Sequence, residues 1–129
     1  MKIILVAILA LSLCYTVSYA ESTPEAVFQA YISALQKGDR DTYLDLLTVE
    51  SRAMVNPVPF LMQREYMDIK DLNFNVQVEG FDKAVVIFNP ASRKIPPYVL
   101  RKERGQWKID LKTMSKDYVF DSKNEWYKK

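Results

Sequence analysis

The chain has 129 residues, a formal net charge of +2, no histidine and a single cysteine, Cys14. A net charge this small produces no overall field that would attract nucleic acid or an anionic membrane, so nucleic-acid binding is not expected. The missing histidine excludes an imidazole base, and a cysteine so near the N-terminus leaves no thiol nucleophile once a leader is removed. No cofactor is expected.

Residues 1–20 have the organisation of a signal peptide. A positive start precedes an apolar run over 3–13, and residues 18–20 have the small-x-small pattern that signal peptidase reads. The run is shorter than the roughly 20 apolar residues of a spanning helix, and no later segment comes close. We therefore expect cleavage after Ala20, no integral membrane segment in the mature protein, and one periplasmic or secreted domain over 21–129.

A second interpretation makes Cys14 a lipidation site, because a lipoprotein carries its thioether-linked lipid on a cysteine just after the apolar run. Leu13 is bulky where the lipoprotein peptidase needs a small residue. Ordinary cleavage is therefore favoured over lipidation, and Cys14 is expected to leave with the signal peptide.

Two helices are predicted at the start of the mature chain. Residues 23–25, Thr-Pro-Glu, have the pattern of an N-cap, a first-turn proline and an acid placed favourably for the helix dipole. The helix ends at Gly38, and Asp39 caps a second helix over roughly 40–47 that folds back against the first. The apolar faces carry Val27, Phe28, Tyr31, Ile32, Leu35, Tyr43, Leu44 and Leu47.

Strands are predicted after a weakly patterned stretch over 48–70, in which a turn at 49–54 precedes a short helix through 60–67. Residues 72–79 alternate strictly between apolar and polar, which is typical of a strand with one buried face. The continuous apolar run over 84–88 favours an interior strand covered on both faces.

A third strand begins at 98–100, and residues 104–105 turn it into a fourth that carries Trp107, Ile109 and Leu111 on one face. Two hairpins imply an antiparallel sheet. Helices first and strands afterwards predict an α+β fold, with the helical hairpin packed on one face of the sheet. The C-terminal tail, 113–129, is too aromatic to remain solvated, so we expect it to dock on the sheet or on a partner.

Residues 23–31, running into 35–39, resemble the first helix and helix break of the nuclear-transport-factor-2-like superfamily, and 105–110 resemble the last strand of its exported members. The order of elements over 23–112 is also similar. The resemblance implies a cone-shaped, cystatin-like fold whose curved sheet wraps the first helix, a pocket between them, and often a homodimer through the sheet. It implies no single activity, because the superfamily includes isomerases, dehydratases, transport adaptors and binding domains.

Enzymes of this superfamily typically use an aspartate with a tyrosine, or a histidine, in an apolar pocket. Here Tyr31, Tyr66 and Tyr98 could reach a pocket, and Asp45 or Glu65 could supply a carboxylate. None of them stands in a catalytic motif of the family, so no catalytic residue is assigned and a packing role is favoured.

A stripe of aromatic residues is the candidate ligand-binding surface. Its rings either fill the core or, where the interior is hollow, form the walls of a pocket. The ligand-binding candidates are Phe28, Tyr31, Tyr66, Phe74, Phe88, Tyr98 and Trp107.

Two charge patterns that suggest binding sites also have simpler structural explanations. Asp39, Asp41 and Asp45 suggest magnesium or calcium chemistry, but the apolar strand and the glycine turn that such sites need are missing, so helix capping is favoured and no metal site is expected. A basic stretch indicates either a patch for an acidic partner or the solvated face of an edge hairpin, and the second is favoured. The stretch comprises Arg93, Lys94, Arg101, Lys102, Arg104, Lys108 and Lys112.

These patterns favour an exported, non-catalytic binding or interaction domain that engages a small apolar ligand or an envelope protein. The alternatives are an isomerase or dehydratase-type enzyme that uses a buried carboxylate and tyrosine, and a structural module that dimerises through its sheet.

The signal-peptide hypothesis predicts the mature N-terminus. Export from a bacterial host should yield a protein that begins at Glu21, as measured by intact mass spectrometry, because signal peptidase cuts after Ala20. A mature protein that begins at Cys14 and carries the mass of a lipid would contradict this prediction.

Overall fold

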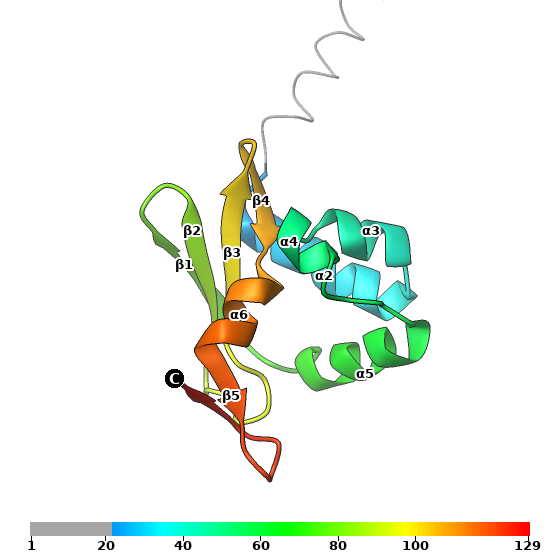
Figure 1. Ribbon diagram of the computed structural model, residues 1–129, viewed down its shortest axis with the longest axis vertical. Coiled ribbons are helices and arrows are strands. Elements are labelled where there is room, and N and C mark those ends of the chain that lie inside the picture. The colour runs from blue at the N-terminus through cyan, green and yellow to red at the C-terminus, as the bar shows by residue number, and fades with distance from the viewer. Residues whose placement is uncertain (1–21) are drawn as a thin grey trace, which may run out of the picture.

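The computed structural model describes residues 22–129, so the expected signal peptide and Cys14 lie outside the described part. Its elements, in chain order, are α2 (Pro24–Lys37), α3 (Arg40–Asp45), α4 (Val49–Arg52), α5 (Pro59–Ile69), β1 (Phe74–Glu79), β2 (Lys83–Phe88), β3 (Tyr98–Glu103), β4 (Gln106–Ile109), α6 (Leu111–Asp117), β5 (Tyr118–Phe120) and β6 (Trp126–Lys128). This order confirms the α+β class, with helices followed by an antiparallel sheet (Figure 1).

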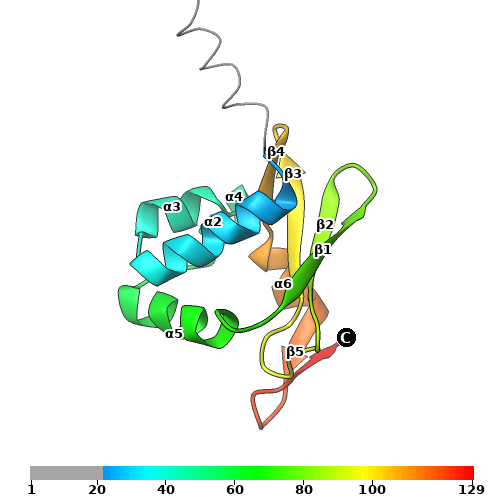
Figure 2. The same ribbon diagram turned by 180° about the vertical axis from the view of Figure 1, so that it is seen from behind.

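The main sheet has four strands in the order β1-β2-β3-β4, and every neighbouring pair is antiparallel. Helices α2 to α5 gather on one side of this sheet, as Figures 1 and 2 show from opposite directions. Helix α6 and the hairpin that follows it extend from the end of β4 toward the bottom of Figure 1. Helix α2 contacts both β1 and β4, so it crosses the sheet.

The helix boundaries follow the capping residues. The Thr23 side chain accepts a hydrogen bond from the Ala26 amide at 3.1 Å, and Gly38 ends α2 with a φ of 64°, which glycine adopts without steric cost. Asp39 then caps α3 by accepting from the amide and the hydroxyl of Thr42. These bonds confirm the capping interpretation of Asp39, and they lower the pKa of its carboxyl.

The core lies between α2 and the sheet. Phe28 is fully buried at its centre, and its ring lies 4.9 Å from the Phe74 ring and 5.0 Å from the Tyr98 ring, centroid to centroid. Leu47 and Ile109 extend the core to the β4 edge, where they form an isolated parallel bridge. Interlocking rings of this kind hold the helix layer and the sheet in one fixed arrangement.

The second face of the sheet is covered differently from the prediction. Val85 and Ile87 of β2 remain half-buried, whereas Val99 of β3 is buried, so β3 is the strand buried on both faces at its start. The reason is that α6 follows β4 directly and contacts β3, so it covers part of that strand.

The fourth strand is shorter than predicted. It ends at Ile109, and Leu111 opens α6 instead of extending the strand, because Asp110 caps that helix by accepting from the Thr113 amide at 3.0 Å.

The C-terminal tail forms α6 and the β5–β6 hairpin. The Trp126 indole donates to the Ser92 carbonyl at 2.6 Å, and the Trp126 amide donates to the Arg93 carbonyl at 3.0 Å, so the hairpin docks on the loop before β3. Within residues 22–129, no helix has the length and apolar character needed to cross a membrane.

The described core predicts that two phenylalanines contribute very differently to the free energy of unfolding. Phe28→Ala should lower the free energy of unfolding by about 3–5 kcal/mol, because the residue is fully buried, whereas Phe81→Ala, at a residue that is 83% exposed, should change it by less than about 0.5 kcal/mol. Urea unfolding of both variants measures this difference. Similar losses in the two variants would contradict the described core.

Candidate functional site

A single carboxylate connects three elements of the fold. Tyr31 of α2 and Tyr98 of β3 each donate a hydrogen bond from the phenol oxygen to Oε2 of Glu65 on α5, and both distances are 2.5 Å. Both tyrosines are buried, so the carboxyl end of Glu65 is enclosed although the residue as a whole is half-buried. We call these three residues the Glu65 cluster.

The electrostatics of the Glu65 cluster combine two opposing effects. Burial raises the pKa of Glu65, since a carboxylate loses its hydration there, and the two tyrosine hydrogen bonds lower the pKa because they stabilise the charged form. The effect of burial is the larger, so the Glu65 pKa is raised. Burial likewise raises the pKa of Tyr31 and of Tyr98 well above the usual value for a phenol, so both remain protonated donors.

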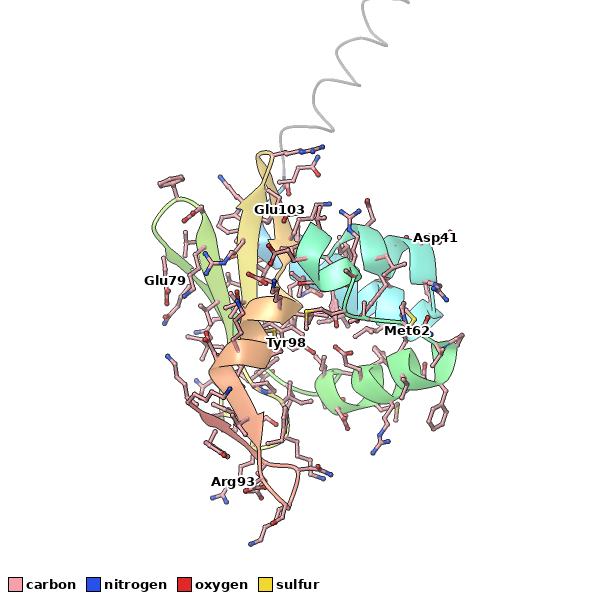
Figure 3. The ribbon with its side chains drawn as sticks, in the orientation of Figure 1. Asp41, Met62, Glu79, Arg93, Tyr98 and Glu103 are labelled. Carbon is pink, nitrogen blue, oxygen red and sulfur yellow. The ribbon has the colours of Figure 1, made fainter. Side chains whose placement is uncertain are left out.

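Glu65 also borders a cavity of about 230 Å³. The wall combines one carboxylate and one amide with largely apolar side chains from α3, α5 and the linker between α4 and α5. The lining residues are Tyr43, Val55, Asn56, Pro57, Leu61, Met62 and Glu65. In Figure 3, Met62 extends from α5 toward the helices above it. Burial raises the pKa of Tyr43 to about 12, and the nearby Glu65 charge contributes to this shift as the second cause. The Tyr43 hydroxyl is therefore protonated as well.

The sequence of α5 explains why an acid faces inward. Pro59 opens the helix at its first turn, where a proline is favourable. Met62 and Ile69 are buried, and Glu65 lies three residues after the first and four before the second, so all three share one helix face. The helix therefore carries Glu65 into the space between α2 and β3.

The structure brings together some of the tyrosines and acids considered for catalysis from the sequence and separates others. Tyr31, Tyr98 and Glu65 meet in one cluster. Tyr66 is half-buried against the core and makes no hydrogen bond to Glu65 among the described residues. Asp45 ends α3, where its backbone carbonyl accepts from Lys108 at 2.5 Å.

The predicted ligand-binding rings do not line the cavity, although Tyr31 and Tyr98 contact Glu65 at its wall. Phe28, Tyr31, Phe74, Phe88 and Tyr98 pack against one another, with neighbouring centroids separated by 4.9 to 6.5 Å. Trp107 is buried in the same core. All seven candidates belong to the described residues, and none of them lines the cavity beside Glu65.

The sequence interpretation missed most of the cavity wall. Val55, Asn56 and Pro57 come from a linker without periodicity, so no pattern marked them. A signal for Glu65 did exist, because it shares the helical spacing of Met62 and Ile69.

Comparisons with protein-family models, with curated proteins and with solved structures found no match. The chemistry of the site therefore rests on its own geometry, namely a carboxylate that is held by two phenols and borders a small, largely apolar cavity.

The raised pKa of Glu65 predicts a pH-dependent difference between the wild type and Glu65→Gln. Between the ordinary value of 4.5 and the raised value, the folded state holds the Glu65 proton more tightly than the unfolded state does, so this group's contribution to stability falls as pH rises through that window. The variant lacks this loss. Its stability relative to the wild type, measured by urea unfolding from pH 4 to 8, should therefore increase with pH.

Two tyrosine variants serve as a comparison for the pH dependence of stability. Tyr98→Phe removes a bond that lowers the Glu65 pKa, so the pH-dependent loss should become larger than in the wild type, whereas Tyr66→Phe should leave the pH profile unchanged. A stability difference between the wild type and Glu65→Gln that stays constant with pH would show that burial does not perturb Glu65.

Proposed function

We propose that this protein is an exported binding domain that holds a small ligand in the cavity beside Glu65. The observation that supports this most strongly is a carboxylate bordering a cavity whose other walls are largely apolar. Such a wall suits a ligand with an apolar body and one hydrogen-bond donor or amine, because the donor pairs with Glu65 and the body displaces water from the remaining surface.

The size of the cavity restricts the ligand. Its volume of about 230 Å³ lies below the roughly 300 Å³ at which sites for drug-sized ligands begin. The proposed ligand is therefore compact, such as a single ring with one polar substituent. This proposal differs in one respect from the expectation drawn from the sequence. The proposed ligand lies among the helices, whereas the expected pocket lay between the helices and the sheet.

We further propose that the domain belongs to the nuclear-transport-factor-2-like superfamily, with the cone-shaped fold and the homodimer through the sheet that this resemblance implies. The order of helices and antiparallel strands supports this assignment, as does the crossing of α2 over the sheet. The signal-peptide pattern over 1–20 supports an extracytoplasmic location.

Binding of compact probes tests the proposed function. Benzylamine should raise the midpoint of thermal unfolding more than benzyl alcohol does, because its ammonium group pairs with the Glu65 carboxylate, and binding to the folded state stabilises by mass action. Glu65→Gln should remove the preference for the amine while keeping the weaker effect of the alcohol.

Two substitutions on α5 separate the cavity from the surface around it. Leu61 and Met67 are each 53% exposed, but only Leu61 lines the cavity. Leu61→Arg should abolish the stabilisation by benzylamine, and Met67→Arg should retain it. Equal responses of the two variants, or no response of the wild type to either probe, would contradict the proposed site.

A second function, proton transfer by Glu65, is favoured by one observation: an enclosed carboxyl with a raised pKa borders a cavity to which Tyr43 also contributes. As a base, Glu65 would take a proton from the carbon next to a carbonyl and return it two carbons further along. The probe is conversion of 3-cyclohexenone into 2-cyclohexenone, followed by ultraviolet absorbance. Turnover that Glu65→Gln abolishes supports the enzyme, whereas binding of the ketone without turnover supports the binding domain.

A further inference from the structure

A second cavity, of about 320 Å³, lies where β3, α4 and α6 meet. All of its lining residues are polar or charged, in contrast to those of the cavity beside Glu65, and the two cavities share no lining residue. The lining residues are Thr48, Glu50, Arg101, Lys102, Glu103, Asp110, Lys112, Thr113 and Lys116. We call this cavity the basic cleft because its four cationic residues outnumber its three acidic ones.

One acid of the basic cleft is buried and fully engaged. Asp110 is 6% exposed, and its carboxylate accepts from Arg101 Nε at 2.9 Å, from the Thr113 hydroxyl at 2.7 Å and from the Thr113 amide at 3.0 Å. These bonds hold Asp110 in one orientation, and the Arg101 side chain is held with it.

The other two acids have partners as well. Glu50 pairs with Lys112 at 2.8 Å, and this contact, together with the Lys116 charge, lowers the pKa of the Glu50 carboxyl. Glu103 accepts from the Val49 amide at 3.2 Å, and Figure 3 shows it on β3 beside α4. Each acid thus has its own donor within the protein.

Cationic donors remain available in the basic cleft. The Arg101 side chain is 41% exposed, and among residues 22–129 only its Nε takes part in a hydrogen bond, so both Nη groups keep their N–H donors. Lys116 is exposed one turn after Lys112 and forms no ion pair with any described residue. Lys102 borders the cleft but shares the other face of β3 with Trp107, and its Nζ lies 5.2 Å from the Trp107 ring centroid.

Protection of a sheet edge accounts for only some of the cations in the basic stretch. The sequence favoured a solvated edge hairpin, in which lysines discourage pairing with other chains. The β3–β4 hairpin does form an edge of the sheet, with β4 as the outer strand, but β3 itself pairs on both sides, so Arg101 lies on an interior strand. The convergence of Arg101 with Lys112 and Lys116 from α6 therefore needs another explanation.

We propose that the basic cleft binds a small oxyanion that carries at least two negative charges, of the phosphate or polycarboxylate class. The Arg101 guanidinium, fixed through Nε by buried Asp110, presents a planar pair of donors that matches two oxygens of such a group. Lys116 supplies further positive charge. This site is independent of the Glu65 cavity, whose carboxylate favours the opposite charge.

Calorimetric titration of the purified protein with inorganic phosphate, pyrophosphate and citrate, at an ionic strength held constant with sodium chloride, tests the proposal. At least one of these probes should bind, and Lys116→Gln and Arg101→Gln should each weaken its binding by about tenfold, since each removes a charge-assisted contact. Arg101→Lys should restore only part of the affinity, because lysine keeps the charge but loses the planar donor pair.

The control variant is Lys123→Gln, which removes an exposed lysine of the β5–β6 hairpin that does not line the cleft. It should bind the probe as the wild type does. Arg101→Gln leaves Asp110 without its cationic partner, so the fold of this variant is checked by circular dichroism. If Arg101→Gln unfolds, Lys116→Gln, at an exposed position, still tests the cleft. No binding of any probe by the wild type, or equal weakening in Lys116→Gln and Lys123→Gln, would overturn the proposal.

Vesicles distinguish the source of the oxyanion. Co-sedimentation with vesicles that contain phosphatidic acid, whose phosphomonoester can carry two charges, but not with phosphatidylcholine vesicles, reversed by the probe that binds, would identify a lipid headgroup phosphate as the ligand. Binding of the soluble probe without co-sedimentation would identify a free anion. Either result supports an oxyanion site that depends on Arg101 and Lys116.

Discussion

Glu65 accepts hydrogen bonds from two phenols, and the arrangement of the helices depends on this interaction. Tyr31 belongs to α2 and Tyr98 to β3, so one carboxylate oxygen fixes α5 against both layers of the fold. A carboxylate in this position is costly because it loses hydration, and two donors offset only part of that cost. The same residue that positions α5 also places a carboxylate at the wall of a cavity, which joins the stability of the fold to its proposed function.

The two cavities give the molecule chemically opposite sites. One has a single carboxylate among largely apolar side chains, and the other has cationic side chains held in place by buried or paired acids. In both, an acid with a structural role determines the chemistry: Glu65 offers charge to a ligand directly, whereas Asp110 orients Arg101. A ligand selected by one cavity is disfavoured by the other on electrostatic grounds.

The sequence predicted the parts of the fold that depend on local rules. Capping by Thr23 and Asp39, the alternation over 72–77 and the turn at 104–105 are each encoded in neighbouring residues, and the α+β order follows from them. The alternation fails at Val78, which was expected on the buried face and is 56% exposed near the end of β1. The cavity beside Glu65 was not predictable in this way, because its wall joins the linker that contains Asn56 to α3 and α5 through long-range packing. Tyr31, Tyr98 and Glu65 were candidates, but their meeting depends on the crossing of α2 over the sheet.

Titration of the Glu65 carboxyl by carbon-13 NMR, with and without benzylamine, is the most direct measurement of the central claim. The account predicts a Glu65 pKa above 4.5 in the free protein, because burial disfavours the charged form, and a lower pKa when the ammonium group of benzylamine lies beside the carboxylate. A Glu65 that titrates at its ordinary value and does not respond to benzylamine would contradict both the enclosed carboxylate and the ligand site built on it.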